Sequence, residues 1–214
     1  MIPILFSGGV SFFFVILSTY LGAKLFKSKN IGQNIQEELV FHEHKKGTPT
    51  MGGIFIVLGT YIGYFAAHIN FWTIGKGFLI ELIDIQRNVL IILLLSSLMA
   101  LVGLFDDILS ISNKRNLGLS ITPKFILQML VASGISYWLY TLEISTELYL
   151  FSGFGIEAGV FKYIIIIFII VFITNAVNIT DGLDGLVAGS SAMSLASVLI
   201  VSFWMYRHPI YYLN

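Results

Sequence analysis

The chain has 214 residues, of which 57% are hydrophobic and only 11% are Asp, Glu, Lys or Arg, whereas soluble domains carry about 25% charged residues. This deficit predicts an integral membrane protein. The 12 basic and 12 acidic residues balance, and without a basic face to neutralise phosphates we expect no nucleic-acid partner. The absence of cysteine excludes disulfides and thiolate metal sites.

Six stretches without acidic or basic residues have the length of membrane helices, which need about 20 mostly apolar residues, with a range of about 17–25. They cover residues 1–23, 51–68, 88–105, 125–142, 163–180 and 185–206. One such stretch is also compatible with a buried core helix, but six leave too little polar chain to cover a soluble fold. We therefore predict an all-α polytopic bundle of about six transmembrane helices that forms a single membrane domain, residues 1–214.

The basic residues predict the orientation of these spans. No basic residue precedes the first span, and Lys24, Lys27 and Lys29 follow it, which favours a retained helix with its N-terminus outside over a signal peptide. The loops that are then placed inside hold eight Lys and Arg residues and the outer segments hold four, in the sense of the positive-inside rule.

Two outer segments have patterns of their own. Between the fourth and fifth spans, residues 147–156 alternate around Ser152-Gly153, which predicts a short outer β-hairpin. Within residues 70–88, aromatic and aliphatic residues accompany a few charges, and we expect a short interfacial helix there.

The first inner loop leads into the second span through the glycine-rich sequence that runs from Lys45-Lys46 through Thr50 to Gly53. Glycine permits close approach of the backbone to a ligand, and Lys45 and the Thr50 hydroxyl are suited to a phosphate. A positive-inside flank followed by a turn is the alternative interpretation.

The third span runs into Asp106-Asp107. Carboxylates at a membrane boundary are costly to desolvate and tend to be functional. Adjacent aspartates repel each other unless a cation lies beside them, and Mg²⁺ favours carboxylates together with substrate phosphate oxygens. A solvated helix end is the alternative. Lys124, which opens the fourth span, is within reach of the same site.

The junction of the fifth and sixth spans carries the most specific pattern. Polar residues recur at every third position: Asn175, Asn178, Asp181 and Asp184. On a helix or 3₁₀ turn this spacing places them roughly on one face, which indicates a site for a polar ligand or a hydrated metal ion rather than an ordinary polar turn. Gly182 and Gly185 permit a break between the two spans.

The inventory of residues favours phosphoryl transfer, in which positioning and charge neutralisation supply most of the rate. No nucleophile–base arrangement and no HExxH zinc motif is present. A transporter or channel is the alternative class, but its charges belong midway through the spans, whereas every carboxylate here lies at a span boundary or in a loop.

At these residues the sequence resembles the phospho-N-acetylmuramoyl-pentapeptide transferases, a branch of the polyprenyl-phosphate N-acetylhexosamine-1-phosphate transferases. Three segments carry the resemblance in order, residues 42–53, 103–107 and 175–186. The run Thr48-Pro-Thr-Met-Gly-Gly is the most specific to this branch and argues against the rival transfer of N-acetylglucosamine-1-phosphate.

The resemblance implies a bacterial plasma-membrane enzyme with a cytoplasmic active site, which converts UDP-N-acetylmuramoyl-pentapeptide and undecaprenyl phosphate into lipid I and UMP with Mg²⁺. It further implies a homodimer. By the same resemblance, Asp106, Asp107 and Asp181 are catalytic, and Asp107 and Asp181 hold the metal. The substrate-binding residues are Lys45, Thr50, Lys124, Asn175, Asn178 and Asp184. Direct displacement and a phospho-enzyme route both stay open.

The sequence departs from the family pattern at two places. Leu109 and Ser110 stand where the family usually has a lysine. Family members also continue past the sixth span with a Gly-Asp-x-Gly-Ser segment and a histidine-rich loop, so we expect this chain to be a fragment, or to lack part of the site and to be inactive alone. A catalytically inactive scaffold is the remaining alternative.

Overall fold

The computed structural model describes residues 2–29, 32, 50–70, 81–82, 86–112, 118–142, 147–151, 154–181 and 185–208. The chain divides into two compact units, Met1–Ser145 and Thr146–Asn214, and each is described by itself. The organisation as one membrane domain stays a prediction.

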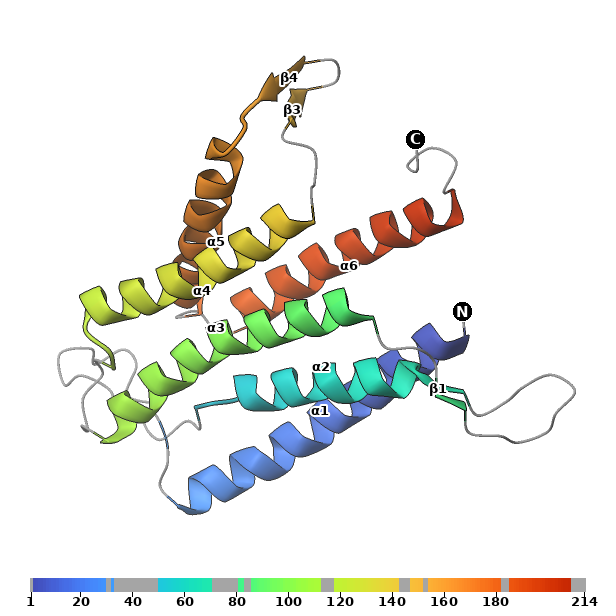
Figure 1. Ribbon diagram of the computed structural model, residues 1–214. Coiled ribbons are helices and arrows are strands. Elements are labelled where there is room, and N and C mark those ends of the chain that lie inside the picture. The colour runs from blue at the N-terminus through green and yellow to red at the C-terminus, as the bar shows by residue number, and fades with distance from the viewer. Residues whose placement is uncertain are drawn as a thin grey trace, which may run out of the picture. The chain divides into compact units, whose positions relative to one another are not determined.

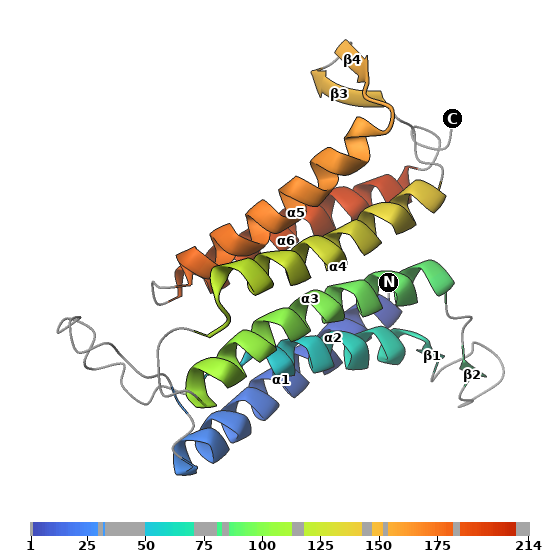
Figure 2. The ribbon, with the colours of Figure 1, turned by 60° about the vertical axis from the view of Figure 1, so that its left-hand side comes forward.

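The first unit contains the helices α1 (Ile2–Ser28), α2 (Gly53–Ala67), α3 (Arg87–Ser112) and α4 (Ile121–Thr141). Successive helices run antiparallel (Figures 1 and 2). The C-terminal ends of α1 and α3 and the N-terminal ends of α2 and α4 therefore lie at one end of the unit, which we call the polar end. This end carries Thr50, the two aspartates of α3 and Lys124.

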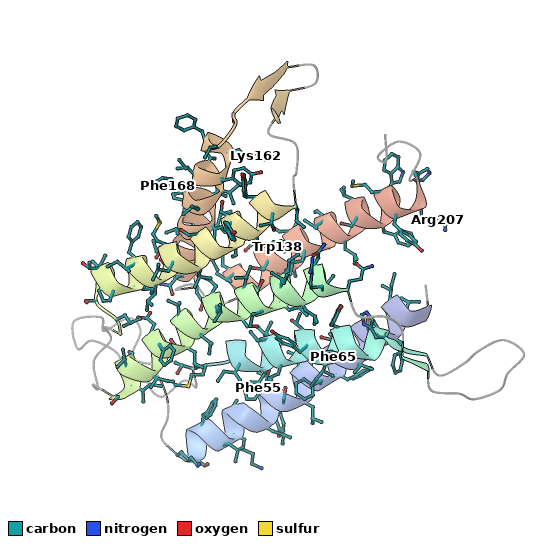
Figure 3. All side chains as sticks on the ribbon, viewed as in Figure 1. Phe55, Phe65, Trp138, Lys162, Phe168 and Arg207 are labelled. Atoms are coloured by element: carbon teal, nitrogen blue, oxygen red, sulfur yellow. The ribbon has the colours of Figure 1, made fainter. Side chains whose placement is uncertain are left out.

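Glycines bring α1 and α2 into close contact. A Cβ atom on Gly63 would lie 2.8 Å from Cβ of Ser11 and 3.2 Å from the backbone oxygen of Ser7, and one on Gly59 would overlap Val15. Gly59 and Gly63 are four residues apart and lie on the same face of α2, in the small-xxx-small pattern of membrane helix pairs. Near the polar end, the ring of Phe55, labelled in Figure 3, takes the space beside Gly22.

A hydrogen bond of 3.0 Å between the hydroxyls of Tyr61 and Ser97 links α2 to α3. The Ser97 hydroxyl donates to the backbone oxygen of Leu93 at 2.7 Å. Since serine has a single hydroxyl proton, Tyr61 is the donor and Ser97 the acceptor. Both hydroxyls are thereby satisfied between apolar helices, where an unsatisfied polar group is costly.

Helix α4 buries one face in the first unit. The residues of this face follow Lys124 at intervals of four positions. Gln128 and Ser136 are each 2% exposed and Ala132 between them is fully buried. These residues lie four apart and form a single stripe. On α3, Val102 is buried. The remaining large apolar side chains of the helices are mostly exposed, as expected where lipid rather than water surrounds them.

Two short strands, β1 (Ile69–Asn70) and β2 (Glu81–Leu82), pair antiparallel between α2 and α3. Residues 70, 81 and 82 of the segment in which a short interfacial helix is expected are therefore in strands, where pairing satisfies their backbone groups. Residues 71–80 and 83–85 of that prediction lie outside the described part, and α3 already begins at Arg87.

The second unit contains strands β3 (Glu147–Phe151) and β4 (Phe154–Glu157) and helices α5 (Phe161–Thr180) and α6 (Leu186–Arg207). β3 and β4 are antiparallel with a register shift between Tyr149 and Phe151, so the predicted hairpin is confirmed. It precedes α5 directly (Figure 1). Gly185, at φ 78°, precedes α6, a conformation that glycine adopts at little cost and that explains the break between the helices.

Four helical segments among the described residues are long and apolar enough to cross a membrane: Ile4–Ser28, Arg87–Ser112, Phe161–Thr180 and Leu186–Arg207. Gly53–Ala67 is a shorter apolar helix, and α4 is made more polar by Lys124, Gln128 and Ser136. All six predicted helices are present, and the prediction of a polytopic helical membrane protein is confirmed.

Candidate functional site

The polar end of the first unit holds an ion pair between the ends of α3 and α4. Lys124 Nζ donates to Asp106 Oδ2 at 2.7 Å, and the two side chains are only 17% and 21% exposed. The other carboxylate oxygen, Oδ1 of Asp106, accepts a hydrogen bond of 2.7 Å from the backbone N–H of Leu119. Both oxygens of Asp106 are thus held by the chain that leads from α3 into α4.

Charge explains why this arrangement forms at the end of α3. Asp106 and Asp107 place two carboxylates at neighbouring positions near the end of α3. Lys124 lies in the first turn of α4, where the antiparallel hairpin returns to the same place. The ammonium therefore offsets a concentration of negative charge that would otherwise favour a bound cation.

Asp106 and Asp107 leave α3 in different directions, because neighbouring residues on an α-helix are rotated by about 100°. Among the described residues, no three His, Asp or Glu side chains form a cluster suited to a metal ion.

Thr50 lies three residues before the start of α2 at the polar end. Its hydroxyl oxygen is buried and has no hydrogen-bond partner among the described residues. The next residue, Met51, has φ 67°, which is uncommon for a residue other than glycine and is found where surrounding structure enforces it. Lys45 lies outside the described residues.

In the second unit, Asn175 and Asn178 lie near the end of α5, and Asp181 caps it. Asn175 Nδ2 donates to the backbone oxygen of Val171 at 2.8 Å. Because an α-helix turns about 100° per residue, a step of three residues moves the side chain by about 60°. The series therefore follows a broad band rather than one line, with Asn178 and Asp181 exposed. Asp184 lies outside the described residues.

The sequence missed two parts of the α3–α4 site: the backbone N–H of Leu119 and the glycine before it. A Cβ on Gly118 would overlap the backbone oxygen and Oδ1 of Asp106. The only signal for them in the sequence is the Gly-Leu pair a few residues before Lys124, which reads as an ordinary loop.

The apolar helices, with two aspartates and a lysine at the ends of adjacent spans, define a multi-pass membrane protein with a charged site at one end. The sequence model of glycosyl transferase family 4 matches residues 89–213, which is more than half of the chain. The chain belongs to this family. Signature 1 of the phospho-N-acetylmuramoyl-pentapeptide-transferases matches residues 45–57.

Curated relatives agree with this assignment. The chain is 34% identical over 224 residues to a protein of Corynebacterium efficiens, with 96% of this chain and 59% of the relative covered. It is 33% identical over 215 residues to a Rhodococcus opacus protein, with coverages of 96% and 58%. Both relatives are named phospho-N-acetylmuramoyl-pentapeptide-transferase. The chain resembles these bacterial proteins and spans about three-fifths of their length.

Proposed function

We propose that the protein takes part in the transfer of phospho-N-acetylmuramoyl-pentapeptide from UDP to undecaprenyl phosphate, with lipid I and UMP as products. One observation carries the proposal. The signature of the transferases matches residues 45–57, and the described part of this segment, residues 50–57, begins α2 at the end of the first unit where α3 ends and α4 begins (Figure 2). The Asp106–Lys124 pair joins these same ends of α3 and α4.

The bond changes define what the site must do. An oxygen of the lipid phosphate attacks the phosphorus that bears the sugar, and the phosphorus–oxygen bond to UMP breaks. Negative charge accumulates on the phosphates, so catalysis depends on positioning and charge neutralisation. In this proposal, direct displacement and a phospho-enzyme route use the same charged groups.

In this proposal, Lys124 neutralises charge on the substrate phosphate. An ammonium has three donor hydrogens, and one of them is directed to Asp106. The proposal assigns the other two to a substrate phosphate. Asp106 then orients the lysine. When the Lys124 ammonium contacts the substrate instead, the Asp106 carboxylate can accept a proton from the lipid phosphate or orient it. Lys45 and the buried Thr50 hydroxyl contribute from the loop before α2.

The donor chemistry fits Mg²⁺, since carboxylates and substrate phosphates are its preferred ligands. Asp107 and Asp181 would hold the ion, which supplies further charge neutralisation when bound. Asn175, Asn178 and Asp184 would bind the nucleotide. The exposed lysines Lys24 and Lys27 at the polar end of α1 support a cytoplasmic location for this end. A homodimer stays a prediction.

The test is an assay with radiolabelled UDP-N-acetylmuramoyl-pentapeptide and undecaprenyl phosphate in detergent. It is performed on the purified chain and on the longest reading frame that contains it. From the longer protein we expect labelled lipid I and equimolar UMP in a Mg²⁺-dependent reaction. Labelling from UDP-N-acetylglucosamine alone would replace the proposal by the rival transfer, and ion flux in liposomes without nucleotide would favour a transporter.

A further inference from the structure

Gly118 has no role in any function proposed so far, yet it lies tightly against Asp106 of α3. A Cβ at this position would overlap the backbone oxygen and the Oδ1 atom of Asp106 and would lie 2.9 Å from its backbone carbon. Two of these three atoms belong to the backbone of a regular helix. They cannot move aside as the tip of a flexible side chain can, so the loop itself has to shift if a side chain is added.

The position of the loop decides how Asp106 is held. The residue after Gly118 donates its N–H to Asp106 Oδ1 at 2.7 Å, and Oδ2 accepts from Lys124 at 2.7 Å. With one oxygen fixed by the backbone, the carboxylate is oriented so that the other meets the ammonium. Displacement of the loop removes the first bond and leaves the carboxylate free to rotate away from Lys124.

We propose that Gly118 is a positioning residue: by lacking a side chain it lets the loop close on α3, so that the Leu119 N–H orients Asp106 and, through it, the Lys124 ammonium that meets a substrate phosphate. Closure of the loop stands on the geometry alone, whereas the step to the phosphate rests on the proposed function. Gly118 acts through Asp106 and touches no substrate.

The first test measures loop closure without any substrate. Hydrogen exchange is followed in peptides that cover residues 118–124 of the intact protein in detergent. In Gly118→Ala we expect the Leu119 amide to exchange about tenfold faster or more, as for the loss of a hydrogen bond to a charged group. Gly134→Ala is the matched control on the same hairpin, because its Cβ would make only an ordinary contact, 3.5 Å from Leu95.

Unchanged exchange at Leu119 in Gly118→Ala would overturn the inference. Asp106→Ala provides a second variant, since it removes the acceptor without adding any atom. It must also accelerate exchange at Leu119, while peptides from α1 and α2 keep their parental rates. A slow Leu119 amide in Asp106→Ala contradicts the proposed contact even if Gly118→Ala fails to fold.

The second test concerns the lysine. In the transferase assay, Gly118→Ala is expected to lower kcat/KM about tenfold, with a higher KM for at least one phosphate-bearing substrate. Partial unfolding lowers only the apparent kcat, because the remaining folded protein binds normally. Unchanged KM values for both substrates would therefore contradict the positioning role. If the parental protein has no transferase activity, the proposed function fails, and the exchange experiment still decides whether Gly118 closes the loop.

Discussion

The ammonium of Lys124 and the carboxylate of Asp106 form an ion pair of 2.7 Å between residues that are 18 positions apart in the chain. The pair joins the last turns of α3 to the first turn of α4. Because both side chains are largely buried, each would be costly without the other. The pair therefore links the two helices of the hairpin, and in the proposed function its ammonium meets a substrate phosphate.

Replacement of the lysine should separate these two effects. Lys124→Gln leaves Asp106 with the Leu119 N–H alone, and we expect the free energy of unfolding in mixed micelles to fall by about 1–3 kcal/mol. Transferase activity should fall further, by about 100-fold, because a preorganised charge is lost from the phosphate. In the double variant with Asp106→Asn, the stability loss should be smaller than the sum of the single losses. Additive losses would show that the two side chains do not interact.

The helices were predictable because lipid imposes a simple rule on composition. The expected spans 163–180 and 185–206 agree with α5 and α6 within a few residues. The third span was expected to end at residue 105, but α3 continues to Ser112. A helix keeps its backbone bonds beyond the apolar region, so charge marks the membrane boundary and not the helix end.

The site was predictable in its residue types but not in its contacts. Asp106 and Lys124 were selected separately, one for its place at a span end and the other for its reach. Their direct pairing depends on how the loop closes, which no periodicity encodes. The role of Leu119 is even less visible, because it acts through a backbone N–H that every residue except proline has.

The glycine contact between α1 and α2 leads to a second prediction. Gly63→Ala introduces a methyl group against Ser11 and the backbone of Ser7, and overpacking of this kind costs about 1–3 kcal/mol. Gly9→Ala in α1 has open space around it, so it should be neutral or slightly stabilising through helix propensity. Thermal unfolding in detergent compares the two variants. Equal stability of both would contradict the close packing of α1 on α2.

The hydrogen bond between α2 and α3 can be measured by a double-mutant cycle. Tyr61→Phe removes the donor and Ser97→Ala the acceptor, and we expect a coupling free energy of about 0.6 kcal/mol, the average for such bonds between membrane helices. The exposed neighbour Ser96 offers the control, since Ser96→Ala combined with Tyr61→Phe should show no coupling. A coupling free energy of similar size with Ser96→Ala would contradict a specific hydrogen bond between Tyr61 and Ser97.

The carboxylates have different proposed roles, so their variants should differ in how activity depends on the Mg²⁺ concentration. Asp107→Asn and Asp181→Asn each remove a proposed ligand, so the Mg²⁺ concentration for half-maximal activity should rise at least about tenfold. Asp106→Asn should lower activity without this shift, because Asp106 positions Lys124. Titration of Mg²⁺ after removal of metal by a chelator provides the measurement. A similar shift for all three variants would place Asp106 among the metal ligands instead.

Sidedness provides the last prediction, because the proposed site needs Asp106 and Asp181 in one aqueous compartment. The chain contains no cysteine, so single cysteines can be introduced and labelled with a membrane-impermeant maleimide in oriented vesicles. Ser28→Cys, Ser112→Cys and Ile179→Cys should react from the same side. Exposed residues at the opposite helix ends should react from the other side, and they are Gln86, Thr141 and Val160. If the cysteine at position 179 reacts from the same side as the one at position 86, the C-terminal ends of α3 and α5 face different compartments. A shared phosphate site is then impossible.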